Sequence, residues 1–366
     1  MVNIENIHAS IDLYLREKVK NNKKLHNAYL LVHSDRHDIH FNMAAGHTDG
    51  TPAHKDQPYH IASIGKLFTA VILAILEEKE MISYHSRVVD YLPEELLTGL
   101  HLYKGRDYTY DIQIRHLLNH SSGIADYFTD KPKRGRPILD RILEEPSRVW
   151  TPQETIGWTK KNLPARFPPG SGFHYSDTGY HLLGLLIEKV TLKKFDQVLH
   201  DLIFKPLDMK QSYLTGYSQP AVASQHPRAG LYVNRVNVID YPSLSIDYAG
   251  GGITSTSEDL LKFMKALVNH ELISFESFDK MKDWSKFNLG MDYGYGLMNV
   301  RTHAFPFLMS RKYNIWGNAG AIGSFMFYNA AMDVYIIGNF NLLNYVRQSF
   351  VFMLKVLRKL SKAGLK

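Results

Sequence analysis

Ser63 and Lys66 could do chemistry together, because the chain places them three residues apart in HIASIGKLFTAVIL, residues 60–73. The apolar pattern of this stretch predicts a buried helix, and residues three apart share one helix face. The serine hydroxyl would then lie at the positive end of the helix dipole, with the ammonium beside it. A lysine among apolar neighbours loses solvation, which favours its neutral form. Such a lysine could take the serine proton and activate a nucleophile.

This spacing alone is also compatible with a capping serine and a lysine that extends to solvent. A second candidate is Tyr175, in the Gly- and Pro-rich loop FPPGSGFHYSD that precedes a predicted helix. A phenol near positive charges can have a lowered pKa and act as a base. The chain contains 22 tyrosines, so a core tyrosine is the alternative.

A third candidate is the predicted strand WGNAGAIGSF, residues 316–325, which is rich in small residues. Glycine inside a strand often marks the close approach of a ligand or of another backbone segment. Such a strand could bind an extended substrate or donate an amide N–H to an oxyanion. The alternative is that small residues allow a helix to pack closely on the sheet.

Together and in this order, the three segments resemble the serine β-lactamase and penicillin-binding-protein superfamily. The likeness is greatest to its class C branch, which includes carboxypeptidases, D-aminopeptidases and esterases. Ser63-Ile64-Gly65-Lys66 fits S-x-x-K, Tyr175-Ser176-Asp177 fits Y-x-N, and Asn318-Ala319-Gly320 stands at the K/H-x-G element. The stretches IRHLLNHSSGIADY and YGYGL are also similar, so the likeness covers most of the chain.

The resemblance implies that Ser63 attacks a carbonyl and forms an acyl-enzyme, without a metal or organic cofactor. Lys66 and Tyr175 would share the proton transfers, with Tyr175 as the base. The backbone N–H groups of Ser63 and Ala321 would form the oxyanion hole. The expected substrate-binding residues are Asp177, Asn318, Gly320, Ala321 and Tyr127, although Tyr127 could equally be a packed loop aromatic.

Two positions depart from the family pattern. Asp177 stands where an amide is usual, and an ionised carboxylate only accepts hydrogen bonds and favours a charged Lys66. Asn318 replaces a cation that would attract a substrate carboxylate. We therefore predict a serine hydrolase of neutral esters or amides. The alternatives are a D,D-peptidase, a D-amino-acid amidase or weak β-lactamase, or a catalytically silent ligand sensor.

The elements that must position these residues alternate along the chain. Strand patterns at 28–34 and 37–46 precede the helix predicted at 63–79, and strand patterns return after residue 290. The predicted fold class is α/β (α+β), with an antiparallel sheet, flanking terminal helices and a mostly helical lobe. We predict a sheet lobe from residues 1–80 and 286–366 and a helical lobe from 81–285, forming a single catalytic unit.

The composition excludes some functions. The chain has no cysteine, which rules out disulfides and thiolate nucleophiles. Its net charge of +7 is mild for 366 residues and scattered, so no nucleic-acid partner is expected. The histidines show no metal-ligand spacing such as H-E-x-x-H. The expected partner is a small-molecule or short-peptide substrate, and the oligomeric state is open.

The two ends of the chain bear on its location. The first 20 residues read as a charged amphipathic helix and not as a signal peptide, which favours a cytoplasmic protein. A removed signal would leave the same sequence, so an extracytoplasmic location stays open. The basic helix predicted at 343–364 could suit an anionic bilayer. The resemblance instead places it against the sheet, so membrane association is not expected.

Overall fold

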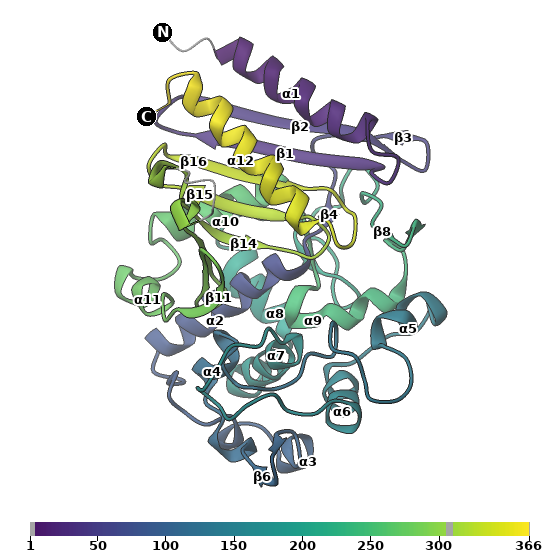
Figure 1. Cartoon of the computed structure of the whole chain (residues 1–366), viewed down its shortest axis with the longest axis vertical. Helices are drawn as coiled ribbons and strands as arrows, with labels where there is room; N and C mark the ends of the chain where they lie inside the picture. Colours follow the sequence, from purple (N-terminus) through teal and green to yellow (C-terminus); the bar gives the residue numbers. More distant parts are fainter. Residues whose placement is uncertain (1–3, 305–309, 366) are drawn as a thin grey trace.

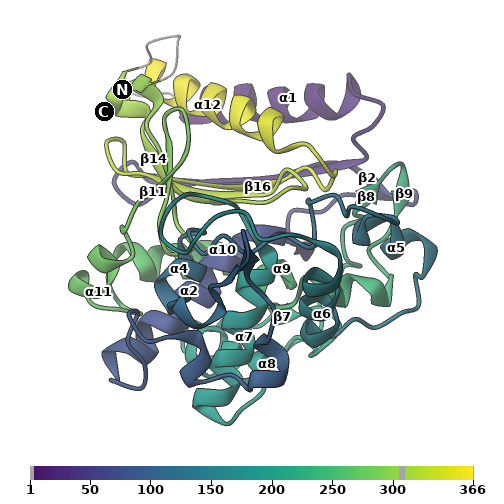
Figure 2. The ribbon, with the colours of Figure 1, turned by 60° about the horizontal axis from the view of Figure 1, so that its bottom comes forward.

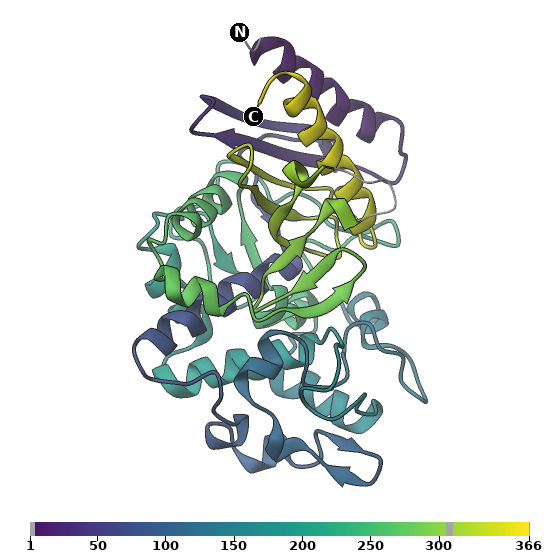
Figure 3. The same cartoon turned by 60° about the vertical axis from the view of Figure 1, so that its left-hand side comes forward.

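The computed structural model describes residues 4–304 and 310–365, which are built around a nine-stranded antiparallel sheet. Both ends of the chain supply its strands: Leu31 on an N-terminal strand pairs with Ile337 near the C-terminus. In spatial order the strands are β11 (Ser285–Asn288), β12 (Met291–Tyr293), β13 (Met298–Val300), β14 (Ile315–Ala319), β15 (Phe325–Asn329), β16 (Val334–Asn339), β1 (Asn27–Ser34), β2 (Ile39–Thr48) and β3 (Thr51–Pro52). Figure 3 shows how the later, green and yellow strands continue the sheet of the purple ones.

Both faces of the sheet are covered, which explains why β1 and β16 are buried at nearly every position. Successive side chains of a strand point to opposite faces. Leu30 and Val32 accordingly pack under the terminal helices, whereas Leu31 and Tyr29 pack toward the middle of the chain. Figures 1 and 2 show the purple α1 (Ile4–Lys20) and the yellow α12 (Val346–Lys362) on one face and the other large helices on the opposite face.

The segment between the two groups of strands supplies most of the helices. They are α2 (Gly65–Glu78), α3 (Glu94–Leu97), α4 (Ile114–Leu118), α5 (Ile138–Glu144), α6 (Pro152–Asn162), α7 (Asp177–Thr191), α8 (Phe195–Leu199), α9 (Tyr248–Gly251), α10 (Ser257–Val268) and α11 (Phe275–Lys280). Helix α2 is apolar around its circumference, so it lies in the interior beneath the sheet. Thr151 and Thr256 cap α6 and α10 through their side chains.

Short strands tie distant segments together. The pairs β5–β6 (Leu102–Tyr103, Arg106–Asp107) and β8–β9 (Tyr232–Val233, Val236–Asn237) are local hairpins. A separate three-stranded sheet joins β4 (Tyr59–His60), β10 (Ile253–Ser255) and β7 (Tyr213–Leu214). This small sheet fixes the chain immediately before the predicted nucleophile.

The predicted fold class is confirmed, with the antiparallel sheet, the terminal helices and the helical middle segment all present. The predicted basic amphipathic helix is α12, and its Phe352, Val356 and Leu360 are buried against the sheet. Among the helices the structure describes, none combines the length and the apolar character that a bilayer crossing requires. The division into two lobes stays a prediction.

Candidate active site

Ser63 lies in a 3-10 turn (Ala62–Ile64) that leads directly into α2. The Ile61 N–H donates to the Ile253 carbonyl at 2.9 Å, which anchors the turn to the small sheet. Ala62 has φ +48°, a left-handed conformation that non-glycine residues adopt at a cost. A Cβ on Gly65 would lie 3.2 Å from the Gly251 Cα, so glycine allows α2 to cross this backbone closely. Ser63 is thus presented by a strained and firmly anchored turn.

Lys66 is fully buried, one turn from Ser63. Its Nζ lies 3.3 Å from the Ser63 Oγ and donates to the Gly250 carbonyl at 2.7 Å and to the Asp177 carboxylate. The Lys66 ammonium also faces the Tyr175 ring, with Nζ 4.9 Å from the ring centroid. A buried ammonium needs such partners, and this one has a carboxylate, a carbonyl and a hydroxyl.

Asp177 is the first residue of α7 and is nearly buried. Its backbone N–H donates to the buried Asp126 carboxylate at 2.9 Å, which fixes the start of the helix. Burial raises the pKa of Asp177 to about 7; the Lys66 ammonium opposes this shift and the nearby Asp126 adds to it. The Asp177 carboxyl and the Lys66 ammonium therefore form a buried pair in direct contact.

The Tyr175 phenol lies beside Lys66, but its pKa is shifted in the opposite direction from the sequence prediction. Burial, followed by the negative charge of Asp177, raises the pKa of Tyr175 well above its ordinary value. The Ser63 and Tyr293 hydroxyls act in the opposite direction. We predicted a phenol with a lowered pKa; the structure contradicts this because burial, followed by the negative charge of Asp177, raises the pKa. Tyr175 is a neutral phenol in this site.

The Asn318 side chain does not reach toward a substrate. It is fully buried and donates to the Gly296 carbonyl at 2.7 Å and to the Tyr293 hydroxyl at 3.3 Å. Its Oδ1 accepts the N–H of Ala319 at 2.7 Å. The expectation that Asn318 binds substrate is therefore corrected: its amide holds Tyr293, whose ring is 5.8 Å from that of Tyr175 and at 89° to it.

The Gly-rich stretch 316–325 is partly a turn. Strand β14 ends at Ala319, and β15 begins at Phe325. A Cβ on Gly320 would lie 2.8 Å from the Ala62 Cβ and 3.0 Å from the Ile61 carbonyl oxygen, so glycine lets this turn abut the segment before Ser63. Ala321 follows, and lines the same cavity as Ser63. The backbone groups predicted for the oxyanion hole thus come from two segments that pack against each other.

The cavity beside Ser63 has mostly apolar walls. Its apolar lining residues are Ala62, Phe128, Leu139, Ile142, Leu231, Val233, Leu244, Ala321, Ile322 and Leu343. Its charged or titratable lining consists of His60, Asp177 and Asp247, and none of the described lining residues is Lys or Arg. The His60 Nε2 lies 2.8 Å from the Asp247 Oδ2.

Tyr127 does not line this cavity. Its ring is buried and its hydroxyl donates to the Ile246 carbonyl at 2.9 Å, so the packed-aromatic alternative describes it. Its neighbour Phe128 faces the cavity instead. Tyr127 and Phe128 are adjacent in the loop, and the sequence holds no signal that shows which of the two lines the cavity.

The sequence reasoning missed Tyr293, Asp247, His60 and Gly250. Tyr293 is the first residue of YGYGL, a stretch already noted as similar to the family, and Gly250 lies in the glycine run of AGGGITSTSEDL. The likeness could have drawn attention to Tyr293, and the glycine run to Gly250. Asp247 and His60 are 187 positions apart and carry no motif, so only the structure brings them together.

Comparisons with known proteins agree with this geometry. The family model described as Beta-lactamase matches residues 15–349. The chain is 26% identical over 283 residues to penicillin-binding protein 4* of Bacillus subtilis strain 168, covering 71% of this chain and 56% of that protein. It spans about half the length of the first curated relatives that it matches.

Solved structures give the same result. A D-stereospecific amidohydrolase from a Streptomyces species is 25% identical, with a TM-score of 0.75 and coverage of 94% of this chain and 97% of that one. EstCE1, a hydrolase with promiscuous acyltransferase activity, shares the fold at 15% identity, with a TM-score of 0.74 and coverage of 96% and 98%. The match of the family model over most of the chain establishes what the three motifs indicated: the protein belongs to the beta-lactamase family.

Proposed function

We propose that the protein is a serine hydrolase that cleaves ester or amide bonds through an acyl-enzyme on Ser63. The observation that carries this proposal is the contact of the buried Lys66 Nζ with the Ser63 Oγ, at 3.3 Å and beside an open cavity. A serine hydroxyl becomes a nucleophile when a positioned group accepts its proton. The anchored turn holds the Ser63 hydroxyl beside Lys66, whose amine form can accept that proton.

The proton acceptor in this proposal is the Lys66–Asp177 pair. The carboxylate takes a proton from the ammonium, which leaves Asp177 neutral and Lys66 as an amine. As the Ser63 Oγ attacks the substrate carbonyl, the amine takes the hydroxyl proton and becomes an ammonium again. The negative charge then lies on the substrate oxygen. The raised pKa of Asp177 supports this role, since a carboxyl with a pKa near 7 can hold the proton at neutral pH.

Tyr175 acts in this scheme as an acid. As a neutral phenol it donates its proton to the departing alcohol or amine, and it recovers a proton from the water that attacks the acyl-enzyme. The Lys66 ammonium returns its proton to the Ser63 oxygen as the acid product leaves. The Tyr293 hydroxyl, held by the Asn318 amide, lowers the pKa of Tyr175 and would stabilise the transient phenolate. Tyr293 is thus a positioning residue for Tyr175. The N–H groups of Ser63 and Ala321 are the proposed oxyanion donors.

The walls of the cavity support an apolar acyl group. Phe128, Leu139 and Ile142 line a cavity whose described lining carries no Lys or Arg. A substrate carboxylate would meet Asp177 and Asp247 without a compensating surface cation. This supports substrates without a free carboxylate and argues against penicillins as good substrates.

A second candidate function, the hydrolysis of D-amino-acid amides, is favoured by Asp247. Asp247 lines the cavity, and its side chain is 19% exposed. His60 pairs with only one of its two carboxylate oxygens. A cationic α-amine on an apolar acyl group would complement this carboxylate. The similarity to a D-stereospecific amidohydrolase is consistent with this candidate.

The proposal is tested with a hydrolysis panel containing p-nitrophenyl esters, D- and L-phenylalanine amides and a chromogenic cephalosporin. We expect turnover of the esters, and of an amide if the second candidate is correct. The Ser63→Ala variant should lose all of it, because the proposed nucleophile is removed. Turnover that survives in Ser63→Ala would place the chemistry elsewhere.

A fluorophosphonate probe separates the enzyme from a silent ligand sensor. The probe phosphonylates a serine only when that serine is activated. We expect one label per chain, located at Ser63 by peptide mass spectrometry and absent from Ser63→Ala. An unlabelled but folded wild-type chain would favour the sensor.

A further inference from the structure

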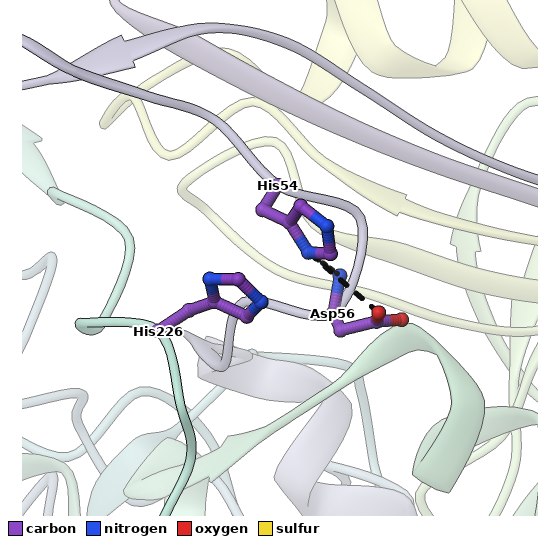
Figure 4. A group of neighbouring side chains, drawn as sticks. All are labelled: His54, Asp56 and His226. Carbon is purple, nitrogen blue, oxygen red and sulfur yellow. Dashed lines mark hydrogen bonds and ion pairs between the residues drawn. The ribbon is translucent and has the colours of Figure 1, made fainter.

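Two histidines and an aspartate come together on the surface, outside the cavity beside Ser63. His54 and Asp56 lie in the link between β3 and β4, and His226 lies in the long loop after β7. The potential ligand atoms of the three side chains all lie within 4.8 Å of one another. Figure 4 shows the two imidazole rings side by side, with the Asp56 carboxylate below His54. None of the three residues lines the catalytic cavity.

The backbone beneath the cluster is rigidly held by Gln57. Its side chain is fully buried, and its Oε1 accepts the His54 N–H at 2.9 Å. The Gln57 Nε2 donates to the Pro227 carbonyl at 3.1 Å, directly after His226. A buried amide thus joins the residue next to Asp56 to the residue next to His226. The two loops hold their donor groups together before any ligand binds, which lowers the entropy cost of binding.

We propose that His54, Asp56 and His226 form a binding site for a divalent transition-metal ion such as Zn²⁺. Two imidazoles and a carboxylate are a set that Zn²⁺, Ni²⁺ and Cu²⁺ accept, whereas Mg²⁺ and Ca²⁺ prefer oxygen ligands alone. Three protein ligands leave the fourth tetrahedral position to water. The His54 and Asp56 side chains are 46% and 43% exposed, so an ion can reach them directly.

Binding requires only small changes at the cluster. The imidazole rings are stacked, with centroids 3.9 Å apart and planes at 21°, and they must open slightly for both to bind one ion. The Asp56 carboxylate pairs with Lys55 at 3.2 Å and approaches the His54 Nδ1 at 3.6 Å. Exposed pairs of this kind contribute little stability, so the ion can replace them. The ion would join the link before β4 to the loop after β7.

The test is calorimetric titration of the purified full chain with ZnCl₂, after removal of bound metal. We expect one Zn²⁺ per chain and a rise in melting temperature of about 3 °C in excess Zn²⁺, because an ion that binds only the folded state stabilises it. His226→Ala and Asp56→Asn should weaken binding about tenfold or more. Binding should weaken on acidification, because imidazole binds metal only when it is neutral.

A matched control is His40→Ala. His33 and His40 also form an exposed pair, with Nδ1 atoms 3.1 Å apart, but their outer nitrogens already bind Asp35 and Glu258. Zn²⁺ affinity should be unchanged in His40→Ala. The proposal is wrong if the wild-type chain binds no Zn²⁺, or if His226→Ala binds it as well as His40→Ala does. Ester hydrolysis should be the same in His226→Ala as in the wild type, so this result is independent of the catalytic proposal.

Discussion

Two regions of the catalytic site differ in kind, a polar wall behind Ser63 and an apolar wall that lines the cavity. The polar wall is sealed: Lys66, Asp177, Tyr293 and Asn318 are buried and bonded to one another or to backbone carbonyls, and of these four only Asp177 lines the cavity. The other is apolar and contributed by loops and short elements, including Leu139 on α5, which is only partly buried. Buried polar networks tolerate little change, because each lost partner leaves an unsatisfied group. Apolar walls tolerate more, at a cost set by the volume removed.

From this difference we infer that separate parts of the molecule determine the rate of the chemical step and the preference among substrates. The polar wall should determine the rate of the chemical step, so its variants should lower kcat. The apolar wall contacts the acyl group throughout, so its variants should mainly change KM and the preference among substrates. A variant of the polar wall that changes only KM would contradict this division of roles.

The largest effect is expected for Lys66→Met. The change keeps the length of the side chain and removes the group that passes the serine proton, so kcat should fall about 1,000-fold or more. The carboxyl of Asp177 would become neutral and the fold would survive. Steady-state kinetics measures the loss, and the melting temperature shows whether the variant is folded. Activity within tenfold of the wild type would remove Lys66 from the mechanism.

Next in size is the pH dependence associated with Asp177. The carboxyl must be ionised to take a proton from Lys66, so activity should rise with pH through about 7. Asp177→Asn should lower kcat about 100-fold and abolish this rise, because an amide does not titrate.

The same residue should affect stability in the opposite direction. The pKa of Asp177 is raised by burial from 3.8 to about 7, so the folded state keeps the proton that the unfolded chain loses. Its contribution to stability is therefore full below pH 3.8 and declines as the pH rises to about 7. Melting curves of the wild type and Asp177→Asn across this range should diverge with increasing pH. Parallel curves would contradict the raised pKa.

The sequence predicted the fold and the convergence of Ser63, Lys66 and Tyr175, because each lies in a motif whose local pattern also shows the element that holds it. It did not predict the protonation of Tyr175, which depends on the burial and the charge of neighbours distant in the sequence. The sequence placed Asn318 at the correct end of a strand, but nothing in the motif indicated that its amide hydrogen-bonds to Gly296 and Tyr293. Nor did the sequence indicate the roles of Asp247 and His226, because their partners are also distant along the chain.

A smaller effect is expected for Tyr293→Phe. The change keeps the ring and removes only the hydroxyl that would stabilise the Tyr175 phenolate, a loss of about 1.4 kcal/mol, or tenfold in kcat with KM unchanged. Tyr180→Phe is the matched control: it is equally buried and its ring lies 5.4 Å from Lys66, but its hydroxyl donates to the Leu118 carbonyl. Equal losses in both variants would assign the effect of Tyr293 to packing.

The smallest effect is expected on the apolar wall, for Leu139→Ala. The lost side chain should reduce kcat/KM for a long-chain p-nitrophenyl ester about tenfold and leave the acetyl ester unchanged, since only the longer acyl group reaches this wall. Leu102→Ala is the control, because its side chain is 59% exposed and does not line the cavity. A fall in kcat for both esters would mean that α5 positions the polar wall as well. Specificity and chemistry would then not be separable in this protein.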